Sequence, residues 1–500
     1  MIPTTNPRTG ERTDTALAPT PPDEVAAIAA LASAAAPELV ALGGAWRADL
    51  LDAIADLITA RSTELAEVAD SETGLGIARL QGEVARSAFQ FSLFAEAVRE
   101  GSYLELMIDH AALTPLGQGP DVRRMLVPIG PVAVFGSSNF PFAFSVLGGD
   151  TASSLAAGCP VVLKAHGSHP LTSALSFEVL SAAAATAGAP HGTVGIVYGQ
   201  RAGVDLVTRP EIRAVGFTGS LGAATALREA IDGREQPIPF FGELSSINPL
   251  VITPAAAAAR GGAIANGLFA SFTASAGQLC TKPGIAFVPE GQPGDDLVAE
   301  LARLTAETAA MVLLNERISG AFADISSRLG SAGGDVLASG AAPTGEGFTV
   351  SPTLLSADVA ELGPDLAEEC FGPLLVVARY RSMDEVAASF GRIPSSLTAT
   401  IHLEDDDTDA LSVVEGAMRD NAGRLVFNGF PTGVRVSWAQ NHGGPWPATN
   451  SQHTSVGVSA VRRFLRPVAW QDAPQWALPA ELRDDATGLP RRIDGALVVP

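Results

Sequence analysis

The chain has 500 residues, 47% of them hydrophobic and 17% charged, and this balance excludes an intrinsically disordered protein. Its formal net charge of −22 argues against a nucleic-acid partner, because phosphate binding requires a basic surface. Three cysteines, an odd and sparse count, indicate a reducing compartment. Since the amino terminus is polar and no apolar run approaches ~18 residues, we expect a cytoplasmic protein with no membrane partner.

The first half of the chain predicts an α/β unit. Residues 1–20, rich in threonine and proline, are expected to form a flexible arm, and helical periodicity follows from Pro22 to Arg99. After an exposed strand at 121–128, strands alternate with helices. The strands are expected at 132–135, 160–164, 194–198 and 214–217, and the helices at 143–157, 171–187, 203–209 and 221–231. This alternation predicts a parallel sheet with ligands bound at the carboxyl ends of its strands.

A second α/β region is expected from about residue 245 to 450. A strand at 248–252 and a helix at 255–272 place Glu243 and Cys280 at the two ends of one strand–helix unit. Glycine in the turn just before Cys280 permits the chain to reverse there. On this evidence alone, the cysteine is either a reactive thiol or a small buried apolar residue.

Two features of the sequence indicate where chemistry takes place. Lys164 and Lys282 are the only lysines beside 30 arginines, and their positions favour a site that needs a compact ammonium group. Four motifs also stand at strand ends, and each alone is weak evidence, since none is the G-x-G-x-x-G fingerprint. They are GSSNFP at 136–141, VVLK at 161–164, GFTGS at 216–220 and EECFGP at 368–373.

Taken in order, these motifs together with the Glu-Leu at 243–244 and the Gly-Gln-Leu-Cys at 277–280 resemble the aldehyde dehydrogenase superfamily, over roughly residues 20 to 475. The stretches GQLCTKPG, FGELSSINP, KAH, FNGFPTGV and HGGPWPAT further resemble the subgroup of 2-oxoglutarate semialdehyde (2,5-dioxopentanoate) dehydrogenases. NADP-dependent fatty aldehyde dehydrogenases are close neighbours of that subgroup.

The resemblance implies a mechanism. Cys280 would attack the aldehyde as a thiolate, and the side chain of Asn139 with the backbone N–H of Cys280 would hold the oxyanion. Glu243 would activate the water that hydrolyses the thioester, which favours hydrolysis over transfer to coenzyme A. No metal is implied.

The resemblance also implies a nicotinamide cofactor. Lys164 would bind the adenosine ribose or its phosphate, and Glu369 would bind the nicotinamide ribose with Phe371 beside it. Gly167 stands where NAD-preferring relatives often carry a ribose-binding glutamate, which leaves room for a 2′-phosphate that Arg201 could pair with. We therefore expect NADP, with NAD as the alternative. The glycine-rich path of the cofactor would be lined by Gly199, Gly203, Gly219 and Ser220.

The fold implied is two doubly wound parallel-sheet domains and a small β oligomerisation hairpin. Strand addition across subunits would give a homodimer or a homotetramer. The expected limits are 1–115 and 131–243 for the cofactor-binding domain, 244–455 for the catalytic domain, 116–130 and 456–475 for the oligomerisation strands, and 476–500 for a carboxyl-terminal tail.

The sequence leaves two classes of aldehyde as candidate substrates. The subgroup carries an arginine near the position of Ser92 and a glutamate near that of Arg435, and both differ here. The substrate is therefore 2-oxoglutarate semialdehyde or a medium- or long-chain aliphatic aldehyde. The aromatic residues that suit an apolar tunnel, or equally a core, are Phe91, Phe94, Phe430 and Trp438. Two readings of a different class are a non-catalytic homologue and a thiol hydrolase without cofactor.

Overall fold

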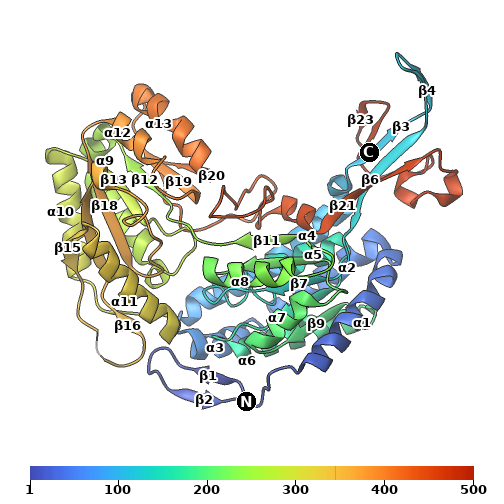
Figure 1. The fold of residues 1–500 in the computed structure, drawn as a ribbon, viewed down its shortest axis with the longest axis horizontal. Coiled ribbons are helices and arrows are strands. Elements are labelled where there is room, and N and C mark those ends of the chain that lie inside the picture. Colours follow the sequence, from blue (N-terminus) through green and yellow to red (C-terminus); the bar gives the residue numbers. More distant parts are fainter. Residues whose placement is uncertain (344) are drawn as a thin grey trace.

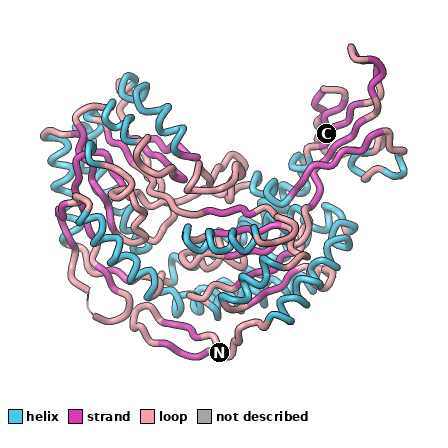
Figure 2. The backbone as a smooth tube through the Cα atoms, viewed as in Figure 1, coloured by secondary structure: helices cyan, strands magenta, loops and turns pink. Residues whose placement is uncertain are grey.

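The computed structural model describes residues 1–343 and 345–500. Two α/β units lie side by side, and an arm of β-strands projects away from both (Figure 1). The tube view shows helices covering the magenta sheets of both units (Figure 2). The two predicted parallel-sheet units are thus confirmed, whereas the exact domain limits stay a prediction.

The amino-terminal unit is built on a five-stranded parallel sheet in the order β11-β10-β7-β8-β9. Alternation along each strand separates its two faces: Val132 and Val134 pack on one side, and Ala133 and Phe135 on the other. The strands are β7 (Val132–Phe135), β8 (Val161–Lys164), β9 (Val194–Val197), β10 (Ala214–Thr218) and β11 (Phe240–Glu243).

Helices cover both faces of this sheet. On one face lie α1 (Pro22–Ala41), α7 (Gln200–Thr208) and α8 (Leu221–Asp232). On the other lie α2 (Gly43–Ala60), α3 (Ser62–Thr73), α4 (Ile77–Glu100), α5 (Gly149–Ala157) and α6 (Pro170–Thr186). α1 is long and apolar enough to cross a membrane by length and composition, but it packs Val25, Ala29 and Ala32 against the sheet.

The second unit has a seven-stranded sheet in the order β15-β17-β18-β13-β12-β19-β20, parallel except for the edge strand β15. α9 (Pro254–Thr273) and α10 (Gln292–Ala306) cover one face. α11 (Glu316–Ser331), α12 (Met383–Ser389) and α13 (Thr408–Asn421) cover the other. The strands are β12 (Leu250–Ile252), β13 (Ile285–Pro289), β15 (Asp335–Ser339), β17 (Thr353–Asp358), β18 (Leu374–Tyr380), β19 (Ser396–His402) and β20 (Ala422–Phe427); β14 (Met311–Val312) pairs with β16 (Thr349–Val350) nearby.

The projecting arm is a five-stranded sheet in the order β21-β6-β3-β22-β23. It consists of β3 (Leu106–Asp109), β6 (Val122–Pro128), β21 (Leu465–Gln471), β22 (Arg491–Ile493) and β23 (Ala496–Val498), with a hairpin of β4 (Ala112–Thr114) and β5 (Gly117–Gly119) at its tip. The polar tail beyond residue 476 therefore supplies two strands of this sheet. The arm begins near residue 106, earlier in the chain than the hairpin that we expected.

Local structure departs from the sequence expectations in two further places. Residues 1–20 are not an irregular arm, because β1 (Pro3–Thr5) and β2 (Arg12–Asp14) form a hairpin fixed by the Arg8–Asp70 ion pair. The helix expected from residue 143 begins at Gly149. The backbone N–H groups of Phe142 and Ala143 instead donate to the buried carboxylate of Glu83, which holds them outside a helix.

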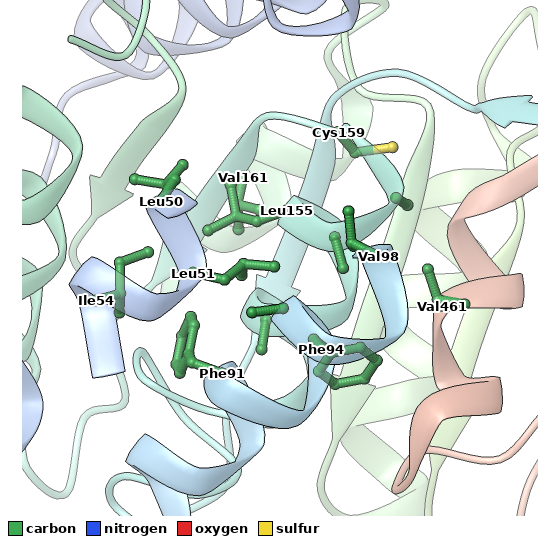
Figure 3. Close-up of a cluster of buried hydrophobic side chains, with 14 of the residues drawn as sticks. Leu50, Leu51, Ile54, Phe91, Phe94, Val98, Leu155, Cys159, Val161 and Val461 are labelled. Atoms are coloured by element: carbon green, nitrogen blue, oxygen red, sulfur yellow. The ribbon is translucent and has the colours of Figure 1, made fainter. Parts of the chain in front are cut away.

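The largest apolar core lies between α2, α4 and the sheet (Figure 3). Phe91 and Phe94 are buried in it, so these two rings form core rather than an aldehyde tunnel. Cys159 is also buried there, and burial raises the pKa of its thiol to about 11, which makes it an inert apolar residue.

Replacing Phe91 with alanine should lower the free energy of unfolding by about 3–5 kcal/mol, because the cavity would lie in a fully buried region. The neighbouring Phe89 on the same helix is 52% exposed and provides a matched control. Phe89→Ala should shift the urea midpoint, followed by circular dichroism, far less than Phe91→Ala. Equal shifts would mean that α4 is not anchored through Phe91.

Candidate active site

The backbone just before Cys280 is bent by three consecutive residues with left-handed dihedral angles. After α9 ends, Ser275, Ala276 and Gly277 have φ values of 53°, 55° and 68°. A side chain at Gly277 would overlap the carbonyl of Gly372, so only glycine allows this close approach. The cysteine loop therefore packs directly against the EECFGP turn, so two motifs that are far apart in the sequence are in contact.

Asn248 fixes the loop that carries Cys280. Its Nδ2 donates to the carbonyls of Cys280 at 2.8 Å and of Lys282 at 3.0 Å. Its Oδ1 accepts hydrogen bonds from the hydroxyl of Ser246 and from the N–H and hydroxyl of Thr398. Asn248 itself has a left-handed φ of 53°, which keeps it out of the expected 248–252 strand, so β12 begins only at Leu250. The amide therefore ties the loop to β19.

Lys282 proves to hold the neighbouring turn together. Its buried Nζ donates to the carbonyls of Cys370 at 3.0 Å and Leu374 at 2.8 Å. The turn between these two residues contains Phe371, and Glu369 directly precedes it. The hypothesis that both lysines belong to a ligand site is therefore not supported for Lys282, whose hydrogen bonds instead position the Glu369 segment. Burial raises the pKa of Cys370 to about 12, so its thiol is inert.

Three reactive side chains converge on this loop: Cys280, Glu243 and His442. Glu243 ends β11, and His442 comes from the long connection between β20 and β21. His442 Nε2 lies 3.5 Å from Cys280 Sγ and 3.0 Å from Glu243 Oε1. The hydroxyl of Ser455 donates to Glu243 Oε2 at 2.8 Å. Both Glu243 and His442 are buried, so this cluster exchanges protons away from bulk water.

Electrostatic interactions in the cluster shift the pKa values of its two acids, Cys280 and Glu243, in opposite directions. Burial raises the pKa of the Cys280 thiol well above its usual value, and the negative charge of Glu243 raises it further. Burial also raises the pKa of Glu243, but the charge and hydrogen bond of His442 and the hydroxyl of Ser455 outweigh it and leave that pKa lowered. At neutral pH the cluster therefore holds a thiol and a carboxylate, with an imidazole nitrogen between them.

Asn139 reaches the cysteine loop from the other unit. It follows β7, and its Nδ2 donates to the carbonyl of Gln278 at 2.9 Å, two residues before Cys280. Its own carbonyl accepts a hydrogen bond from Arg79. The side-chain amide is thereby fixed beside the cysteine, and one of its two N–H groups is left for an incoming oxygen atom.

The predicted cofactor residues gather at one edge of the five-stranded sheet. The parallel registers align Phe135 with Lys164 and Thr218 with Glu243, so the carboxyl ends of these strands are level. Gly199 precedes α7, while Gly219 leads to Ser220, whose hydroxyl caps α8. The open amino ends of two helices therefore face the same edge, as an anionic ligand requires.

Close packing explains why residue 203 is a glycine, and burial explains why the pKa of Lys164 is lowered. A Cβ at Gly203 would lie 3.0 Å from the Phe135 ring and 3.3 Å from Cγ of Lys164, so the aliphatic part of the lysine lies directly on this glycine. Burial lowers the pKa of Lys164, and no hydrogen bond joins its ammonium group to any residue within 1–343 or 345–500. A Cβ at Gly167 would meet nothing within 4 Å. The space beside Gly167 and the ammonium group of Lys164 are therefore open to a ligand at this edge.

Glu369 lies near the reactive cluster, whereas Arg201 lies in the first turn of α7 and points its side chain into solvent. Burial raises the pKa of Glu369 to about 7, and hydrogen bonds with Ser245 and the charge of Lys282 oppose the rise. Phe371 packs against the core of the second unit. The side chain of Arg201 is 84% exposed and pairs with Asp205 at 2.8 Å.

Sequence reasoning missed several residues of this site. His442 is the first residue of the HGGPWPAT stretch, whose sequence predicts no role for the histidine. Asn248 lies in the strand expected beside Glu243, where an apolar pattern gives no sign of its hydrogen bonds. Ser92, where an arginine was expected, lines a groove on the outer side of α4 with Ala55 and Asp56 of α2. Its identity therefore says little about the substrate.

Comparisons with known proteins agree with this geometry. The model of the aldehyde dehydrogenase family matches residues 1–446. Alpha-ketoglutaric semialdehyde dehydrogenase 2 of Azospirillum brasilense is 44% identical over 90% of this chain and 87% of its own. The alpha-ketoglutaric semialdehyde dehydrogenase of Acinetobacter baylyi is 42% identical over the same shares. A crystal structure of an aldehyde dehydrogenase C variant from Pseudomonas syringae superposes with a TM-score of 0.80 at 23% identity, over 95% of this chain and 94% of that one.

Replacing Glu243 with glutamine should lower the pH at which Cys280 becomes reactive. The carboxylate charge disfavours the thiolate, so its removal lowers the pKa of the thiol. The measurement is the rate of iodoacetamide alkylation against pH, with Cys280→Ser as the blank for the buried Cys159 and Cys370. Glu369 contributes less to the same effect, so Glu369→Gln should produce a smaller shift in the same direction. A shift to higher pH in Glu243→Gln would contradict this electrostatic account.

Proposed function

Because this chain belongs to the aldehyde dehydrogenase family, we propose that it oxidises 2-oxoglutarate semialdehyde, also called alpha-ketoglutaric semialdehyde, to 2-oxoglutarate with NADP. The observation that carries this proposal is the cluster of Cys280, His442 and Glu243 at the edge where the cofactor residues meet. The names of the two relatives above 40% identity support the choice of substrate.

In the first half of the proposed reaction, the Cys280 sulfur forms a bond with the aldehyde carbon. Its proton leaves to the carboxylate of Glu243 and from there to water, because His442 Nε2 must carry a hydrogen to donate to that carboxylate and cannot accept a second one. The oxyanion of the thiohemiacetal is held by the free N–H of Asn139 and the backbone N–H of Cys280. One such donor is typically worth about 3–4 kcal/mol.

A nicotinamide cofactor bound at this edge would supply the hydride acceptor for the conversion of the thiohemiacetal to a thioester. Hydrolysis of that thioester then requires a base. Glu243 is ionised because its pKa is lowered, and Ser455 and His442 fix the orientation of both its oxygens. It takes a proton from water, the hydroxide oxygen bonds to the acyl carbon, and the Cys280 sulfur leaves as the thiolate.

The proposed preference for NADP rests on Lys164 and Gly167. The lysine ammonium is held near the cofactor edge by the packing of its stem on Gly203, and open space surrounds Gly167. A glutamate at that position would repel a 2′-phosphate and bind the ribose hydroxyls instead. Arg201 is a further candidate for the phosphate, and it would have to exchange Asp205 for it.

We further propose a homodimer or homotetramer in the cytoplasm. The arm ends in edge strand β21, whose side chains are largely exposed and whose backbone is free to pair on one side. A reducing compartment is consistent with three free cysteines, two of them buried and one in the reactive cluster.

The substrate proposal predicts that the wild-type enzyme oxidises 2-oxoglutarate semialdehyde with at least a tenfold higher kcat/KM than octanal. Formation of NADPH at 340 nm measures both. Cys280→Ala should abolish the activity while retaining NADP binding by fluorescence titration, whereas Cys159→Ala should remain active because that thiol is only part of the core. A preference for octanal would replace the proposed substrate with an aliphatic aldehyde.

Gly167→Glu should reverse the cofactor preference. The new carboxylate would repel the 2′-phosphate, so the ratio of kcat/KM for NADP to that for NAD should fall by about tenfold or more, given ~1.5–3 kcal/mol for a charged hydrogen bond. Gly320→Glu makes the same change on α11, where a side chain also meets open space, and should leave the ratio unchanged. A wild-type enzyme that prefers NAD would overturn the specificity argument.

A further inference from the structure

One arginine beside the reactive cluster has no partner for its charge. Arg86 lies on α4, and its Nε and Nη2 are buried without a hydrogen-bond partner in the described residues, 1–343 and 345–500. An unpaired buried guanidinium is costly, because its donors lose water and gain nothing in return. Such a group is retained where a ligand supplies the missing acceptor.

The position of Arg86 is fixed by two aromatic rings. Its Cζ lies 5.2 Å from the centroid of the Phe144 ring and 5.8 Å from that of Phe140. Phe144 also contacts His442, with ring centroids 5.9 Å apart. The guanidinium is therefore separated from His442, and so from the Cys280 sulfur, by one aromatic ring.

The other arginines near the cluster are already engaged. Arg79 pairs with Glu83 at 3.2 Å and donates to the carbonyl of Asn139. Arg424 directs both of its terminal nitrogens at backbone carbonyls, those of Pro431 and Gly433. Arg86 is thus the cation near the thiol whose planar fork remains available for a carboxylate.

The positive charge of Arg86 interacts electrostatically with the reactive groups of the site. Burial lowers the pKa of this guanidinium, and the negative charges of Cys280, Glu83 and Glu243 partly restore it. Glu83 does not neutralise it, since that carboxylate already binds Arg79 and the backbone N–H groups of Phe142 and Ala143. A positive charge that faces both the nucleophile and the base suits a substrate with an anionic end.

We propose that Arg86 binds the carboxylate at the far end of the aldehyde substrate, an inference that rests on the proposed function and names the residue that selects for an acidic semialdehyde. Phe140 and Phe144 hold the guanidinium plane, and their rings contact the carbon chain between the carboxylate and the aldehyde. The aldehyde carbon then lies at Cys280 while the carboxylate is held by Arg86.

The test compares two aldehydes that differ only in this carboxylate: 5-oxopentanoate and pentanal. In Arg86→Met, kcat/KM for 5-oxopentanoate should fall by about 10–100-fold, the loss expected for a charge-assisted hydrogen-bonded pair. That for pentanal should change by less than about threefold. Arg86→Lys should give an intermediate loss, because it keeps the charge but not the fork. Arg99→Met removes an exposed arginine from the same helix and should affect neither substrate.

Binding without turnover gives a second readout. Glutarate should inhibit the wild-type enzyme competitively against 5-oxopentanoate, and its inhibition constant should rise about tenfold or more in Arg86→Met, while that of pentan-1-ol, which carries no carboxylate, stays constant. An equal loss of kcat/KM for both aldehydes with unchanged glutarate inhibition would show that Arg86 supports the thiolate instead, and would overturn the proposal.

Failure of this inference is distinguishable from failure of the proposed function. If the wild-type enzyme prefers 5-oxopentanoate to pentanal and Arg86→Met keeps that preference, the acidic substrate stands and Arg86 is not its anchor. If the wild-type enzyme shows no such preference, both the acidic substrate and the role of Arg86 are wrong.

Discussion

The buried side chain of Asn248 is the constraint on which the reactive site depends. Its side-chain amide joins the cysteine loop to β19 through both N–H groups and the oxygen, and its backbone N–H donates to the hydroxyl of Ser396. A buried amide that lost one of these partners would cost about 1–3 kcal/mol, so the loop has a single favourable position. The thiol of Cys280 can therefore be held within reach of His442 although its loop contains strained, left-handed residues.

From this fixed loop, contacts extend to the remaining parts of the site. Gly277 lets the loop contact Gly372, and Lys282 ties the ends of the same turn through two carbonyls. Asn139 reaches across from the first unit to the carbonyl of Gln278. Motifs separated by 88 to 139 residues are thus connected through backbone atoms, which are insensitive to most side-chain changes.

Within this frame, the surrounding charges and the burial give two neighbouring carboxylates, Glu243 and Glu369, different pKa values. His442 and Ser455 keep Glu243 ionised, while burial raises the pKa of Glu369 to about 7. Two carboxylates with different proton affinities can serve different roles, one as a base and one as a ligand for hydroxyl groups. Arg86 contributes the opposite charge locally, although the protein as a whole carries −22. The long-range repulsion of an anionic substrate is therefore offset at the site itself.

The sequence by itself predicted the alternation of strands and helices and the order of the motifs, because apolar periodicity and spacing are local properties of the chain. Cys280, Glu243 and Asn139 were predicted from the resemblance of those motifs to a family, and their roles stay predictions. The sequence could not place His442 beside the thiol or Arg86 beside Phe144, since each contact forms only when segments far apart in the chain pack together. Nor could it separate Lys282 from Lys164, as both are lysines near strand ends, and only packing decides that one donates to two carbonyls. The late start of the helix expected at 143 and the two strands formed by residues beyond 476 have the same reason: distant partners, Glu83 and β3, determine those backbones. Hydrogen bonds between distant segments leave no periodic trace in a sequence, and the tertiary structure alone decides them.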